Sequence, residues 1–234
     1  MHLPELNTRL NLNLDIPCVP SSSVDNVDPF APIPNLENKN KIDVIYLGNS
    51  MIERLKNTGK DTRLGALESA WNAGVGGDAN SNVVGRFEMG MYDMLKRNQG
   101  AETGNLYIKL WILASGTNDL HAKHTFRGNE LEAYRRILEA CLRIAPRSQI
   151  LACDVFYRKD IPDGIVDEGN GLMEQIVKEL NAEVAAEKIL WVEARHLIGK
   201  EMLVDHVHLD EKGYAAWDEV LWPQVCEILN ESID

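Results

Sequence analysis

The sequence predicts an α/β protein in which a parallel, five-stranded sheet lies between two layers of helices. Short apolar runs alternate along the chain with segments whose apolar residues recur at helical spacing. Continuous apolar runs are typical of strands that are buried on both faces, and regular alternation of strands and helices favours parallel pairing. These observations predict a three-layer α/β/α, doubly wound (flavodoxin-like) fold.

Each predicted strand is one of the apolar runs. They are KIDVIYLG (41–48), LESAWNAG (67–74), LYIKLWILAS (106–115), QILACDVF (149–156) and KILWVEA (188–194). Trp71, Trp111 and Trp191 lie within these runs, so we expect their large side chains in the core.

The predicted helices lie between and after the strands. Three patterns repeat at helical spacing, formed by Val83, Val84, Phe87, Met91, Met94 and Leu95, by Tyr134, Ile137, Leu138, Cys141 and Ile144, and by Met173, Ile176, Val177, Leu180 and Val184. We expect Asp78 to cap the first helix and Pro146 to end the second. Residues 211–233 are expected to form a closing helix with a kink at Pro223.

The length of 234 residues fits one α/β domain with a sizeable core. Residues 1–40 are rich in Pro, Ser and Asn and lack strand or helical periodicity, so they are expected to form an irregular N-terminal arm. Residues 41–234 then form a single domain.

Charge, apolar runs and cysteine spacing limit the classes of binding partner and the cellular compartment that we expect. The chain has 36 acidic and 24 basic residues and a formal charge of -12, which argues against nucleic acid as a partner. No apolar stretch is long enough to span a membrane, and the N-terminus lacks the pattern of a signal peptide. The four cysteines are widely separated. We therefore expect a cytoplasmic protein with reduced thiols.

Polar residues follow the predicted strands, where a doubly wound fold binds its ligands. Ser50 follows the first strand, and Asp205 and His208 lie together in a later loop. A serine hydroxyl needs a base within hydrogen-bonding reach and an acid behind that base to become a nucleophile. His208 and Asp205 are suitable in type, although an isolated serine before a helix is more often an N-cap.

The same loops offer donors for a negatively charged tetrahedral intermediate. Suitable groups are the backbone N–H groups of Ser50 and Gly77 and the side-chain amide of Asn118. Ile52 occupies the place of the second glycine of the G-x-S-x-G motif, so the chain lacks the nucleophile elbow of α/β-hydrolases.

Four ordered blocks now point to a known family. Gly48-Asn49-Ser50, the stretch from Asn72 to Asp78, Gly116-Thr117-Asn118-Asp119 and Asp205-x-x-His208 resemble the SGNH, or GDSL-type, hydrolases. The stretch NAGVGGDANSNVVGRF together with GTND most resembles the catalytic subunits of intracellular platelet-activating factor acetylhydrolase. The resemblance begins near Asp43 and does not cover the arm.

The resemblance implies a serine esterase that needs no metal or organic cofactor. Ser50 is then the nucleophile, His208 the general base and then acid, and Asp205 the carboxylate that orients it. Ser50, Gly77 and Asn118 form the oxyanion hole. The implied substrate is a small-molecule or lipid ester with a short acyl group. The resemblance also implies either a homodimer or association with a regulatory partner. Met51, Leu120 and Leu209 flank these residues and are candidate pocket walls.

Several alternatives compete for the same residues. His206 with His208 and His121 with His124 could supply zinc ligands, although a metal on His208 would occupy the nitrogen that Ser50 needs. NAGVGGD could be a nucleotide loop, but it lacks the G-x-G-x-x-G spacing. Asp119 is either a catalytic carboxylate or a buried partner that steadies its loop.

One residue departs from the family pattern. Asn49 stands where the family usually has Asp next to the nucleophile. This change motivates a second hypothesis, in which the chain is a weakly active or inactive member that serves as a binding module.

Overall fold

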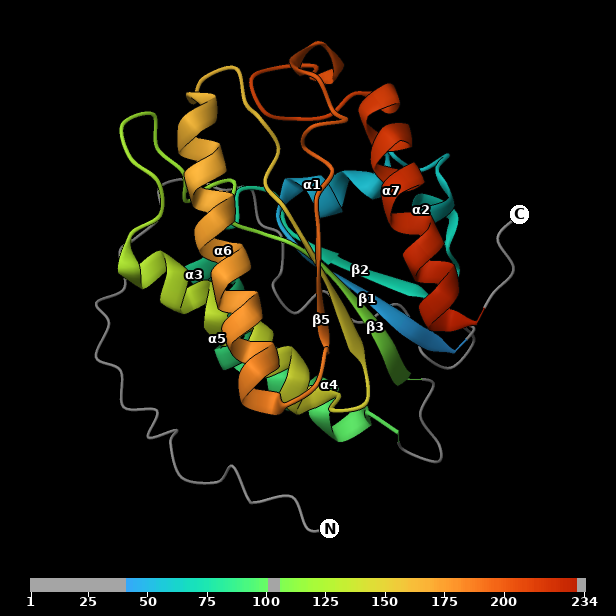
Figure 1. Cartoon of the computed structure of the whole chain (residues 1–234). Coiled ribbons are helices and arrows are strands. Elements are labelled where there is room, and N and C mark those ends of the chain that lie inside the picture. Colours follow the sequence, from blue (N-terminus) through green and yellow to red (C-terminus); the bar gives the residue numbers. More distant parts are fainter. Residues whose placement is uncertain (1–40, 101–105, 231–234) are drawn as a thin grey trace. The chain divides into compact units, whose positions relative to one another are not determined.

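The computed structural model describes residues 41–100 and 106–230, and the predicted arm (1–40) lies outside these residues. Five parallel strands form one sheet in the order β2-β1-β3-β4-β5, which confirms the predicted fold (Figure 1). The strands are β1 (Ile42–Gly48), β2 (Ala70–Gly74), β3 (Leu106–Ala114), β4 (Gln149–Cys153) and β5 (Ile189–Val192).

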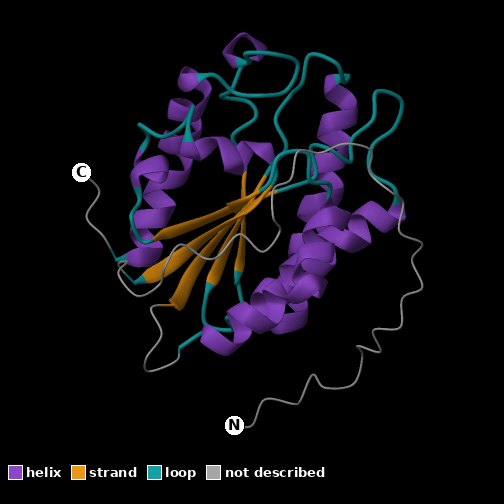
Figure 2. Ribbon diagram, turned by 180° about the vertical axis from the view of Figure 1, so that it is seen from behind, coloured by secondary structure: helices purple, strands orange, loops and turns teal. Residues whose placement is uncertain are grey.

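Helices cover both faces of the sheet, as Figure 1 and Figure 2 show from opposite sides. One face packs against α3 (Asn80–Arg86), α4 (Tyr92–Asn98), α5 (Gly128–Ile144) and α6 (Asp163–Val184). The other packs against α1 (Ser50–Glu53), α2 (Arg63–Ala66) and α7 (Glu211–Leu229). Shorter helical turns are η2 (Arg54–Lys56), η3 (Phe87–Met91, a π-helical turn) and η4 (Lys200–Met202).

The two apolar layers explain why the strands carry runs of consecutive apolar residues. Ile45 and Leu47 of β1 belong to the core on the α5 and α6 side. Val44 and Tyr46 point the other way, into the core under α7. Because successive side chains alternate between faces, the part of a strand that is covered on both sides is apolar at consecutive positions.

Trp111 is fully buried, whereas Trp71 and Trp191 pack partly buried against the same core. Cys141 and Cys153 are buried thiols, and Cys18 lies outside the described residues. None of the described helices combines the length and the apolarity needed to cross a membrane.

The first predicted helix is divided in the structure. It consists of α3, the turn η3 and α4, because Gly90 has φ +117, which interrupts the helical backbone. The second strand is shorter than predicted and begins at Ala70, after α2 and a turn.

The prediction that Asp78 caps α3 is wrong. Ala79 occupies the N-cap position, and the N–H of Asn80 donates to Oδ2 of Asp119 from the loop after β3. The Asp78 carboxylate is instead 2.9 Å from the guanidinium of Arg86. The Asp78 side chain, which the local sequence would assign to the N-cap, therefore pairs with Arg86, the last residue of α3.

Helices α5 and α7 begin or end close to where the sequence pattern predicts. Helix α5 ends at Ile144, before Pro146, as predicted. Helix α7 begins after Asp210, whose side chain accepts from the N–H of Gly213, and it continues through Pro223 to Leu229.

Candidate active site

Strand register brings the polar loops to one edge of the sheet. Gly48, the last residue of β1, lies opposite Gly74 of β2 and Ala114 of β3. Because the three parallel strands end at the same level, the segments that follow them start side by side. A side chain at Gly48 would place its Cβ 1.9 Å from the carbonyl oxygen of Ala114, so only glycine allows β1 and β3 to end this closely.

Ser50 is the first residue of α1 and does not cap it. The N-cap is Asn49, whose Oδ1 accepts from the N–H of Met51 at 3.0 Å. The cap function that competed with a nucleophilic role for Ser50 therefore belongs to its neighbour. An aspartate at position 49 would offer the same acceptor, so this contact does not depend on the charge that Asn49 lacks.

Ser50, His208 and Asp205 form a hydrogen-bonded chain. Oγ of Ser50 is 3.0 Å from Nε2 of His208, and Nδ1 of His208 is 2.7 Å from Oδ2 of Asp205. Because an ionised carboxylate only accepts, Nδ1 carries the proton that bonds to Asp205. Nε2 is then free to accept from the serine hydroxyl, which is the tautomer a general base requires.

The loop itself holds Asp205 in place. Oδ1 of Asp205 accepts from the backbone N–H groups of Val207 and His208, each at 2.8 Å. Desolvation acts to raise the pKa of Asp205, but the bonds from the His208 ring and from both N–H groups outweigh it and hold the pKa well below its usual range. Asp205 is therefore a stable carboxylate behind the imidazole.

Two of the three proposed oxyanion donors, Gly77 and Asn118, lie on the loops after β2 and β3. Gly77 is exposed, its φ is +81, and a Cβ there would meet no atom within 4 Å, so the space beside its Cα is open. Asn118 is also exposed, and its Nδ2 donates to the carbonyl of Asp78 at 2.9 Å. The side-chain nitrogen of asparagine carries two hydrogens, so this bond orients the Asn118 side chain and leaves one N–H to donate to a ligand.

A buried ion pair that sequence reasoning missed joins the same loops. Besides its contact with Asp78, Arg86 donates to the carbonyls of Ala73 at 2.7 Å and Gly48 at 3.3 Å. Desolvation raises the pKa of Asp78 and lowers that of Arg86, while each partner opposes the shift of the other. One guanidinium thus fixes the ends of β1 and β2 and the loop that carries Gly77.

The three candidate pocket residues are all buried. Met51 and Leu209 belong to the core under α7, and Leu120 belongs to the core on the opposite face of the sheet. Their role as pocket walls stays a prediction.

The competing hypothesis of a zinc site has no support among the described residues. His121 and His124 pair as an isolated antiparallel bridge and stack on each other, and Nε2 of His124 is 3.0 Å from the guanidinium of Arg127. His206 is exposed and lies 3.9 Å from Asp160. Within residues 41–100 and 106–230, no group of three or more His, Cys, Asp or Glu side chains is placed to hold a metal ion.

Asp119 has a structural partner rather than a place in the Ser50 chain. It accepts from the Asn80 N–H and so joins the loop after β3 to α3. Burial raises its pKa to about 7, the Asn80 N–H opposes this rise and Glu130 adds to it.

The fold and this arrangement define a class of protein, an α/β protein with a Ser-His-Asp chain at the carboxyl end of a parallel sheet. Residues 47–216 match the model of the GDSL-like Lipase/Acylhydrolase family. The chain therefore belongs to this family of esterases and acylhydrolases, which confirms the family indicated by the four sequence blocks. No match was found among curated proteins.

Solved structures share the fold at low sequence identity. A GDSL-like lipase from Bacteroides thetaiotaomicron is 18% identical, with a TM-score of 0.56 over 80% of this chain and 89% of that chain. A Streptococcus pneumonia protein named for platelet activating factor is 16% identical, with a TM-score of 0.55 over 81% and 85%. An acetyl esterase crystallised with acetate ion is 16% identical, with a TM-score of 0.55 over 81% and 98%.

Proposed function

We propose that the protein is a serine ester hydrolase in which Ser50 is the nucleophile. The observation that carries this proposal is the chain of contacts from Ser50 through His208 to Asp205, at 3.0 Å and 2.7 Å, in a member of an acylhydrolase family. Each contact has the atom order that general-base activation of a serine requires.

The reaction proceeds through an acyl-enzyme. The Ser50 hydroxyl attacks the ester carbonyl while His208 takes its proton. The N–H groups of Ser50 and Gly77 and the Asn118 amide stabilise the oxyanion, and His208 then protonates the leaving alcohol. Water, activated by the same imidazole, attacks the acyl group, releases the acid and restores Ser50.

A short acyl group, with acetyl first, is the substrate class we propose. The resemblance to acetylhydrolases and the structural likeness to an acetyl esterase support it. The alternative, a weakly active or inactive binding module, rests on Asn49 and on the N-terminal arm that the resemblance does not cover. The observed contact of Asn49 is one that aspartate would also make, and the arm lies outside the described residues. Nothing in the described site therefore favours the binding module over the esterase.

Hydrolysis of p-nitrophenyl acetate by the wild type and by Ser50→Ala tests the proposal. Ser81→Ala is the matched control, because Ser81 is an exposed serine on α3. Turnover should disappear in Ser50→Ala and persist in Ser81→Ala. A fluorophosphonate should react with the wild type, and mass spectrometry should locate the label on Ser50. Absence of both turnover and label in a folded wild-type protein would refute the proposal. A series of longer acyl esters then tests the preference for acetyl.

A further inference from the structure

The loop after β4 contacts two of the loops that form the candidate site. Nη1 of Arg158 donates to the carbonyl of Thr117 at 2.7 Å, directly before Asn118. The next residue, Lys159, donates from its N–H to the carbonyl of His206 and from Nζ to that of Leu203, both at 2.9 Å. The oxyanion donor Asn118 and the segment before His208 are therefore tied to consecutive residues.

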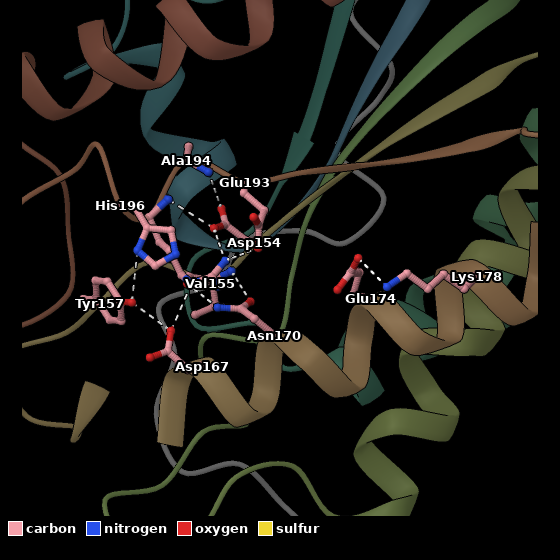
Figure 3. Close-up of polar contacts among 11 residues, drawn as sticks. Asp154, Val155, Tyr157, Asp167, Asn170, Glu174, Lys178, Glu193, Ala194 and His196 are labelled. Atoms are coloured by element: carbon pink, nitrogen blue, oxygen red, sulfur yellow. Dashed lines mark hydrogen bonds and ion pairs between the residues drawn. The ribbon is translucent and has the colours of Figure 1, made fainter. Parts of the chain in front are cut away.

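The base of this loop is anchored firmly. The side chain of Asn170 on α6 accepts from the N–H of Val155 and donates to its carbonyl, at 2.8 Å and 2.9 Å (Figure 3). The carboxylate of Asp154 accepts from the N–H groups of Ala194 and Arg195. Because the start of this loop is held in place, the loop can hold the backbone segments that Arg158 and Lys159 contact in fixed positions.

Arg158 is itself held in one orientation. Its side chain is only 10% exposed, and Nε and Nη2 bond to the two oxygens of Asp160 at 2.9 Å and 2.7 Å. The planar fork fixes the guanidinium in two places, so that Nη1 is aimed at the Thr117 carbonyl. A flexible ammonium could satisfy either partner but not hold this geometry.

We propose that Arg158, held by Asp160, is a positioning residue that fixes the Asn118 amide through the Thr117 carbonyl. This inference rests on the proposed function, in which Asn118 stabilises the oxyanion. Lys159 ties the same loop to the segment before His208, so the oxyanion donor and the general base keep a fixed mutual position.

The kinetic test compares Arg158→Met and Arg158→Lys with Arg135→Met. Arg135 is a matched control, because it also pairs with several carboxylates, but between α5 and α6. Misplacing one catalytic group by about an ångström costs on the order of 100-fold in rate. We therefore expect Arg158→Met to lower kcat by about 10- to 100-fold with KM nearly unchanged. Arg158→Lys should recover part of this loss, and Arg135→Met should behave as wild type.

A double-mutant cycle with Asn118→Ala identifies the route of the effect. If Arg158 acts through Asn118, Arg158→Met should cost much less in the Asn118→Ala background than in the wild type. Equal costs in the two backgrounds, or an unchanged kcat in Arg158→Met, would overturn the proposal.

A second readout separates this inference from the esterase assignment. The N–H of Asp119 donates to the Gly116 carbonyl within the turn that carries Asn118. Its amide hydrogen exchange should be faster in Arg158→Met than in Arg135→Met even if the wild type hydrolyses no ester. Absent wild-type turnover refutes the proposed function, whereas unchanged exchange refutes the role of Arg158.

If Arg158→Met fails to fold, Asp160→Asn replaces it in both experiments. Asp160 has a side chain that is 42% exposed, so this change leaves the core intact while weakening the hold on Arg158. A smaller loss of kcat with the same dependence on Asn118 supports the proposal, and wild-type kinetics with wild-type exchange contradict it.

Discussion

Removing the guanidinium of Arg86 should destabilise the protein far more than removing a surface arginine. In Arg86→Met, the Asp78 carboxylate loses its ion pair, and the carbonyls of Ala73 and Gly48 each lose a donor. The side chains of Arg86 and Asp78 are only 14% and 12% exposed, so water replaces these contacts poorly. Breaking a buried pair from one side costs about 3 to 5 kcal/mol, which we expect as the fall in the free energy of unfolding.

Substitution of Asp78, alone and together with Arg86, measures the interaction free energy between the two side chains. Asp78→Asn removes the negative charge but leaves Arg86 its two carbonyl partners, so we expect a smaller loss of about 1 to 3 kcal/mol. The double variant leaves no unpaired buried charge. It should therefore be less destabilised than the sum of the single changes, by about 2 kcal/mol.

Urea unfolding of the four proteins at pH 7, followed by tryptophan fluorescence and circular dichroism, measures these free energies. Arg135→Met serves again as the control and should cost no more than about 1 kcal/mol, because its pairs lie near the surface. A loss below about 1 kcal/mol for Arg86→Met, or strict additivity in the double variant, would refute the reasoning that Arg86 and Asp78 act as a buried unit.

Three further predictions follow from single residues. Asn118→Ala should lower kcat by hundreds of fold, about 2.7 to 4 kcal/mol in the barrier, with little change in unfolding by urea; full turnover would contradict its role. Gly48→Ala should cost at least about 3 kcal/mol, because its Cβ would meet the Ala114 carbonyl at 1.9 Å; thermal unfolding near the wild-type temperature would be inconsistent with this clash. The pKa of Asp119 is raised to about 7 by burial, so its contribution to stability is complete below about pH 4 and is lost as the pH rises to about 7. Urea unfolding between pH 4 and 8 should therefore show a decline of about 4 kcal/mol, at about 1.4 kcal/mol for each pKa unit, that is missing in Asp119→Asn; equal pH dependence in both proteins would show that Asp119 is not the titrating group.

Local chemistry was sufficient to predict the sheet and to nominate Ser50, His208 and Asp205, whose side chains lie within hydrogen-bonding distance of one another in the structure. The catalytic, oxyanion and pocket roles of the nominated residues stay predictions. A strand that is covered on both faces carries consecutive apolar residues, so the run from Val44 to Leu47 indicates a central parallel strand without any tertiary information. The carboxyl ends of such strands meet at one edge, which predicted that Ser50 and Asn118 would lie in adjoining loops. The contact between Ser50 and His208 follows from the same rule.

The tertiary structure decided which partner each polar side chain takes. Asp78 resembles a helix cap in sequence, yet it pairs with Arg86, and Asp119 bonds to the start of α3 from 39 residues away. The bond from Arg158 to Thr117 joins residues 41 positions apart. A cap or an apolar period depends on neighbours within a few positions, whereas a buried charge takes whichever partner the packed fold brings within reach, and that partner can come from any other element.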